Sequence, residues 1–249
     1  GPGGIFGEDV KPPLEGERIS VLLNQRSLSP SPELADKHIL LPAPTPNASW
    51  PQAGGYASHA MHHITVSDNL KLIWNADAGA GATDEIRLVG SPIVSGGRVF
   101  AMDSATAVSA FDAKTGKKFW RVELTPAEED GDDNIGGGLA FENGVVFATT
   151  GFAQVIAIEA ASGKILWRKQ VAGPMRTAPT VRAGRVFAIT VDSHLYALDA
   201  RDGTEIWSYT GISEVASLLG GASPAVDAGV VVAPFASGEL IALKAENGR

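Results

Sequence analysis

The stretch SAFDAKTGKKFW, residues 109–120, decides the fold of this chain, because its pattern returns twice. Residues 157–167 read AIEAASGKILW, and residues 197–207 read ALDARDGTEIW. In each copy an acidic residue is followed four residues later by glycine and eight residues later by tryptophan. A repeat of this kind sets the architecture of the whole chain. The repeated positions are Asp112, Gly116, Trp120, Glu159, Gly163, Trp167, Asp199, Gly203 and Trp207.

Each residue type in this signature has a physical role. The acidic side chain can accept backbone N–H bonds at the entrance of a turn, and the glycine supplies a positive φ. The tryptophan places a large ring on the outer strand. One unit alone cannot cover that ring, so the units must stack against their neighbours, and about three or more are needed for stability.

A second glycine marks the first turn of every unit and measures the length of the repeat. It recurs at Gly97, Gly144, Gly184 and Gly229, which are 47, 40 and 45 residues apart. That pitch is typical of a β-propeller blade. Three complete units cover Ser91–Trp120, Gly138–Trp167 and Ala178–Trp207, and a truncated fourth covers Ser223–Arg249.

Each unit is predicted to contain four short strands. In the third unit they cover Thr180–Arg182, Val186–Thr190, Leu195–Asp199 and Glu205–Tyr209, separated by turn residues. Trp74 resembles the end of a further blade whose earlier strands are not found upstream. We therefore predict an all-β propeller of four-stranded antiparallel blades, present here as about half a ring. A second copy of the chain or a further C-terminal half would complete it.

The first 49 residues differ from the rest in composition. Nine of the 15 prolines lie within residues 1–51, and no strand or helix periodicity persists there. We interpret residues 1–49 as an extended tether ahead of blades in residues 50–249. The start GPGG lacks methionine and resembles the remnant of a protease site, so we expect an export signal or a lipidated residue to have stood before it.

Composition excludes several classes of function. The net charge of −8, the pI near 5.1 and the lack of any Lys/Arg cluster argue against a nucleic-acid surface. The chain has no cysteine, which excludes disulfides, cysteine-bound zinc and thiol nucleophiles. No run of about 18 apolar residues, as a membrane span requires, is present.

The signature resembles the repeat of quinoprotein-type propellers, in which the tryptophan docks between blades. It differs from WD40 repeats, because none of the three tryptophans is followed by aspartate. Within the quinoprotein group the whole chain is most similar to the BamB family of outer-membrane assembly lipoproteins, in its alphaproteobacterial form. The resemblance covers residues 12–22, residues 50–55 and all the blades, and it implies a ring of eight blades.

The resemblance implies a non-catalytic scaffold, lipid-anchored at the periplasmic face of the outer membrane. It would bind the periplasmic part of a BamA-like β-barrel insertase, with unfolded outer-membrane proteins as a further candidate partner. In that family a loop entering a blade contacts the insertase and carries an arginine before the glycine, where this chain has Leu219. A second, acidic contact loop would fall beyond Arg249. The implied partner-binding residues are Val215, Ala216, Ser217, Leu218, Leu219 and Gly220, with Leu218 and Leu219 foremost.

Two alternatives come from other classes of function. Quinoprotein dehydrogenases hold pyrroloquinoline quinone over a tryptophan, with calcium and an acidic base. All five tryptophans here lie in repeat positions or in the N-terminal segment, and the vicinal cysteine pair of many such enzymes is absent. We therefore predict no enzyme, no catalytic residue and no cofactor. The other alternative is a purely structural ring with a small ligand in its central channel.

One acidic run has part of the pattern of a calcium-binding loop but lacks two of the residues that such a loop requires. Asp130, Asp132 and Asn134 have the alternate spacing of a coordinating loop. Ile135 stands where glycine is needed, and Phe141 stands where the bidentate glutamate belongs. We interpret residues 128–134 as a solvated inter-blade loop, with a partner-facing acidic patch as the alternative.

Two further motifs have structural interpretations. The cluster His59, His62 and His63 could place two of its rings on one side of a helical turn. A metal site would also need a third and a fourth ligand, and no residue nearby has a matching pattern, so we expect a polar loop and no metal site. Residues 136–138 are three glycines that precede a predicted strand, not a helix, so they lack the amide-rich helix start that holds phosphate. We interpret them as the entry of a blade.

Overall fold

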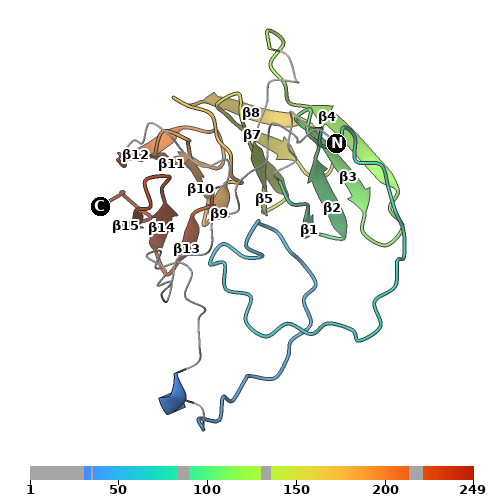
Figure 1. Ribbon diagram of the computed structural model, residues 1–249. Coiled ribbons are helices and arrows are strands. Elements are labelled where there is room, and N and C mark those ends of the chain that lie inside the picture. The colour runs from blue at the N-terminus through green and yellow to red at the C-terminus, as the bar shows by residue number, and fades with distance from the viewer. Residues whose placement is uncertain (1–30, 35, 84–89, 130–135, 213–220) are drawn as a thin grey trace, which may run out of the picture. The chain divides into compact units, whose positions relative to one another are not determined.

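The computed structural model of the chain describes residues 31–34, 36–83, 90–129, 136–212 and 221–249 (Figure 1). The chain divides into two units, residues 1–42 and residues 43–249. In the first unit the described residues include the 3-10 helix η2 (Pro32–Leu34), which is exposed. Across the described ranges, no helix combines the length and apolarity of a membrane span.

The strands of the second unit form four antiparallel sheets in which each strand pairs with its neighbour in sequence. Their expected arrangement as propeller blades is confirmed, and the strands of the third sheet lie within one residue of the predicted ranges. The fourth sheet has three strands in the described part of the chain. The four sheets are β1 (Ile93–Ser95), β2 (Arg98–Met102), β3 (Ala107–Asp112) and β4 (Lys118–Glu123); β5 (Gly137–Glu142), β6 (Val145–Thr150), β7 (Gln154–Glu159) and β8 (Ile165–Gln170); β9 (Thr180–Arg182), β10 (Arg185–Ile189), β11 (His194–Asp199) and β12 (Glu205–Thr210); and β13 (Ala225–Asp227), β14 (Val230–Pro234) and β15 (Leu240–Lys244).

The hydrophobic core lies between adjacent blades. Alternate residues of β10 show why: Val186 and Ala188 pack toward the second blade, whereas Phe187 and Ile189 pack toward the fourth. Because strand side chains alternate between faces, a strand that is covered on both sides reads as a continuous apolar run. Each first strand lies beside the first strand of the next blade, so β1, β5, β9 and β13 line the inner side of the array (Figure 1).

Trp120 and Trp167 dock on the turn that joins the third and fourth strands of the following blade. The indole Nε1–H of Trp120 donates to the carbonyl of Ala160 at 3.0 Å, and Trp167 donates to Ala200 at 3.1 Å. Trp74 makes the same contact with the first blade, donating to Ala113 at 3.0 Å, although the residues around it form no strand. The predicted covering of each ring by the next blade is confirmed.

The turn glycine is therefore required for two reasons. Gly163 has a φ of +79°, which disfavours side chains, and a Cβ there would lie 2.7 Å from the Trp120 ring. Gly144 in the first turn of the same blade has a φ of +82° and open space around it. The first-turn glycine serves the backbone alone, whereas the second also accommodates the neighbouring blade.

The two aspartates of the signature accept backbone N–H bonds in their turns, as expected, whereas Glu159 accepts a hydrogen bond from the Ser162 hydroxyl. Asp199 accepts hydrogen bonds from the backbone N–H of Arg201 at 2.9 Å and from the Arg201 guanidinium at 2.7 Å and 3.0 Å. The side chain of Arg201, and then its backbone N–H, lower the pKa of Asp199 to about 2. The hydrogen bonds of Thr115 lower the pKa of Asp112 in the equivalent turn.

We expect Arg201→Ala to raise the pKa of Asp199 from about 2 toward its ordinary value of 3.8. A depressed folded-state pKa stabilises the fold above the unfolded-state value, and this contribution disappears as the pH falls from about 4 toward 2. The variant should lose less stability than the parent in that window. NMR titration of the carboxyl carbon would report the pKa, with Asp112 as an internal control. An unchanged pKa of Asp199 in the variant would contradict the assignment of the pKa shift to Arg201.

Candidate partner-docking face

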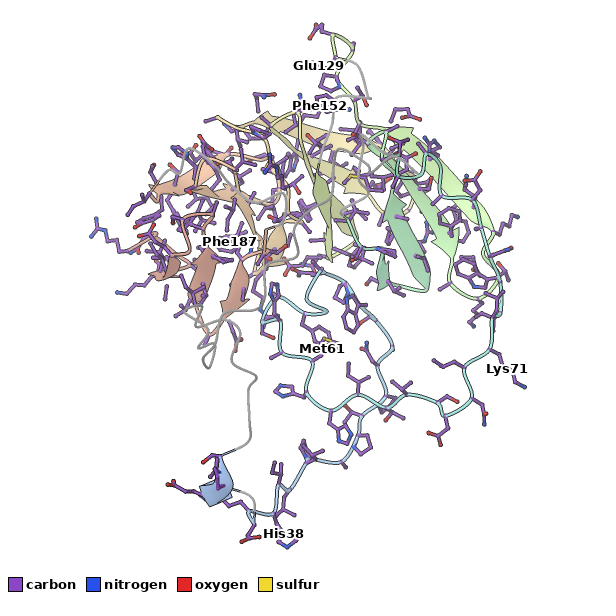
Figure 2. All side chains as sticks on the ribbon, in the orientation of Figure 1. His38, Met61, Lys71, Glu129, Phe152 and Phe187 are labelled. Carbon is purple, nitrogen blue, oxygen red and sulfur yellow. The ribbon has the colours of Figure 1, made fainter. Side chains whose placement is uncertain are left out.

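Two sets of loops share one end of the blades, because the strands alternate in direction. The connections between blades leave β4, β8 and β12 at the same end as the β2–β3, β6–β7 and β10–β11 turns. Figure 2 shows Glu129, from a connection, and Phe152, from the β6–β7 turn, at this end of the sheets, with Met61 near the other. We call this end the loop face. Rigid sheets hold its loops at fixed spacing, as binding surfaces require.

The predicted partner-binding residues 215–220 belong to the connection between β12 and β13, and they lie outside the described residues. The described flanks of this connection are exposed, at Ile212 on one side and at Gly221 and Ala222 on the other. The backbone N–H of Ile212 donates to the Glu239 carboxylate at 3.2 Å, in the β14–β15 turn. The flank therefore begins at a fixed position on the loop face.

A pocket of about 260 Å³ opens beside these flanks, between the third and fourth blades. Four different loops and strand ends of the loop face build it, so no single stretch of sequence encodes it. Small residues on its rim, including Gly221 and Ala222, leave it accessible. The lining residues are Arg176, Thr177, Ile189, Thr190, Val191, Gly221, Ala222, Pro234, Phe235, Ala236 and Gly238.

The interior of this pocket is mainly apolar with few polar groups. Phe235 is buried and stacks on Tyr209 with the ring centroids 6.0 Å apart, which holds its ring in place. The hydroxyl of Thr177 is buried and has no hydrogen-bond partner among the described residues. Apolar pockets with a few placed polar groups suit a side chain that carries one polar atom. Thr190, which also lines the pocket, donates its hydroxyl hydrogen bond to the Asp192 carboxylate.

Sequence reasoning missed these lining residues. Arg176 and Thr177 enter from the β8–β9 connection, and Phe235 enters from the β14–β15 turn. These residues could have been found from their equivalent positions in successive repeats. Every inter-blade connection, and every turn between the second and third strands of a blade, reaches the same face. Arg176 lines the pocket together with Gly221 and Ala222, which follow the predicted partner-binding segment in sequence.

The other motifs fall into separate places. Glu128 and Glu129 are exposed, and residues 130–134 lie outside the described residues. Within the described ranges, no three His, Cys, Asp or Glu side chains gather closely enough to hold a metal ion. His59 packs beside Gly54, and burial lowers its pKa. Gly137 begins β5, so the interpretation of these glycines as a blade entry is confirmed.

A family sequence model described as "Outer membrane protein assembly factor BamB" matches residues 23–131 and 104–249. Several curated relatives carry the same name, and two of them illustrate the match. The protein of Nitrosomonas eutropha is 30% identical over 61% of this chain and 35% of its own length. The protein of Yersinia pestis is 30% identical over 71% of this chain and 46% of its own length. The chain thus spans less than half the length of these relatives.

Solved structures share the fold. BamB from Moraxella catarrhalis aligns with a TM-score of 0.56 at 23% identity, covering 67% of this chain and 47% of that one. Quinohemoprotein alcohol dehydrogenase from Comamonas testosteroni aligns with a TM-score of 0.52 at 22% identity, covering 65% and 27%. At these identities the likeness concerns the propeller architecture, which enzymes and non-enzymes share.

Proposed function

Because the chain belongs to the family of the outer membrane protein assembly factor BamB, we propose that it is a scaffold in the assembly of outer-membrane β-barrel proteins. Its loop face would dock the periplasmic part of a BamA-like insertase. A Pro-rich, lipid-anchored tether would hold it at the periplasmic face of the outer membrane. The match to the family over nearly the whole chain carries this proposal.

The structure supports a docking role in physical terms. Packing of the second and third sheets between neighbouring blades keeps the loops of the loop face in position, so little ordering is needed when a partner binds. The pocket between the third and fourth blades offers a buried aromatic floor with an open rim of small residues. Interfaces concentrate their binding energy in such well-packed depressions. The pocket therefore fits an apolar anchor side chain of the partner.

A charge placed on the pocket rim should weaken docking without unfolding the protein. Ala222 is exposed and lines the pocket, so Ala222→Asp would force a carboxylate to be desolvated as the partner's anchor enters. We expect the Kd for the purified periplasmic domains of the insertase to rise at least about tenfold, a loss of about 1.4 kcal/mol. Isothermal titration calorimetry would measure it.

Ala161→Asp is the matched control. Ala161 is exposed in the β7–β8 turn, at the opposite end of the blades, and the same charge is added there. It should leave the Kd unchanged, and both variants should unfold within about 2 °C of the parent. Equal weakening by both variants, or an unchanged Kd for Ala222→Asp, would contradict docking at this pocket.

A further inference from the structure

The innermost strand of each blade has one edge that its own sheet does not pair. β1, β5, β9 and β13 bond to the second strand of their sheet on one side only. Their other edges carry backbone N–H and C=O groups that need partners when water is excluded. Residues 50–57, which precede all four blades in sequence, pass these edges and supply hydrogen-bond partners to one residue of each strand (Figure 1).

The first two blades are contacted by consecutive backbone groups. Trp50 pairs with Val94 of β1 in both directions, with N–O distances of 2.7 Å and 2.8 Å. The carbonyl of Pro51 accepts the backbone N–H of Phe141 in β5 at 2.8 Å. Proline suits this position because its carbonyl is used and its missing N–H is not.

The third blade is contacted by a side chain that replaces a peptide group. The Gln52 carboxamide donates from Nε2 to the carbonyl of Val181 in β9 at 2.7 Å and accepts the Val181 N–H on Oε1 at 2.9 Å. This is the donor and acceptor pair that a neighbouring strand would provide. Gln52 is only 4% exposed, so both bonds are made away from water.

The fourth blade is reached after a tight turn. Gln52 and Gly55 bond to each other through their backbones, and Gly55 has a φ of +89° that favours glycine. The chain then places the carbonyl of Ala57 2.7 Å from the N–H of Val226 in β13. Ala57 is buried in the same cluster as Val226 and Phe235, so this contact joins the core.

We propose that residues 50–57 form an inner clasp that holds the four blades in register, with Gln52 as its positioning residue. One segment bonds the inner edge of each of the four described blades, so a shift of any of these blades breaks a hydrogen bond of the clasp. The clasp contacts β1 and β5 near their turns to β2 and β6, at the end away from the loop face. It therefore stabilises the array without occupying that face, and it stands independently of the docking proposal.

Cutting the chain between the clasp and the blades tests this directly. Residues 65–73 are exposed, so a protease site can be inserted there and cleaved after the full chain has folded. We expect the N-terminal piece to stay with the blades on gel filtration, held by the clasp alone. The same cut in Gln52→Glu should release it, because glutamate cannot donate to the Val181 carbonyl and buries a charge beside it.

Gln170→Glu is the matched control, because Gln170 is exposed on β8 and its change also adds one negative charge. The cut Gln170→Glu protein should keep the N-terminal piece. In the uncut protein, Gln52→Glu should lower the Tm by at least about 5 °C and Gln170→Glu by less than about 2 °C. Loss of the piece from the cut parent would overturn the clasp, whether or not either variant folds. Equal behaviour of the two variants would overturn the role of Gln52.

Discussion

Gly163→Ala is expected to lower the free energy of unfolding of the blades, residues 43–249, by about 3 kcal/mol, against about 1 kcal/mol for Gly144→Ala. Both glycines have nearly the same φ, +79° and +82°, so alanine at either position introduces a similar backbone strain. They differ in their surroundings, because a Cβ at Gly144 meets nothing within 4 Å, whereas one at Gly163 meets the Trp120 ring at 2.7 Å. The additional loss measures the displacement of Trp120 from its dock.

Urea unfolding of the two variants would provide this comparison, with the slope of the transition checked for change. Displacing the ring also weakens the indole bond to the Ala160 carbonyl, so near-ultraviolet circular dichroism should change in Gly163→Ala and not in Gly144→Ala. Equal losses of stability would mean that the glycine serves only its turn. The docking account of the repeat would then be wrong.

Trp207→Ala should have the largest effect of any single substitution considered, about 3–5 kcal/mol. Trp207 is the most buried of the docking tryptophans and lies between the third and fourth blades. Its ring packs 6.0 Å from that of Phe187, and its Nε1–H donates to the Ala245 carbonyl at 3.1 Å. Removing it opens a cavity and leaves a buried carbonyl without its donor.

Two further variants separate the contribution of the packed ring from that of its hydrogen bond. Trp207→Phe keeps most of the ring volume and loses the hydrogen bond, so about 1–2 kcal/mol is expected. Ile206→Ala changes the adjacent residue of β12, which is 43% exposed, and should cost less than about 1 kcal/mol. Denaturant unfolding of all three variants checks this order. A loss in Trp207→Ala no greater than in Ile206→Ala would contradict the docking of blades through tryptophan.

The repeat made the blades predictable, because its constraints are local. The acid, glycine and tryptophan of each hairpin lie within nine residues, and the turn glycine of the first hairpin fixes where a blade starts. Strand ends therefore fell within a residue of their expected places in β9 to β12. The tryptophan dock was also predictable in kind, since a large ring on an outer strand needs a neighbour.

The pocket and the clasp could not be predicted in the same way, because both depend on contacts between distant residues. Gln52 pairs with Val181, 129 residues away, through a side chain that carries no strand pattern. Phe235 and Thr177 meet at the pocket from loops of different blades, and their sequences share no motif. Residues 215–220, expected from family resemblance, stay a prediction.

The loop face as a docking surface is most directly tested by site-specific photo-crosslinking in the cell that makes the protein. A photoreactive amino acid would replace Ala236, exposed at the pocket, or Ala161, exposed at the opposite end of the blades. The proposal predicts a crosslink to the BamA-like insertase from position 236 and none from position 161. A crosslink to the insertase from position 161 but not from position 236 would contradict it.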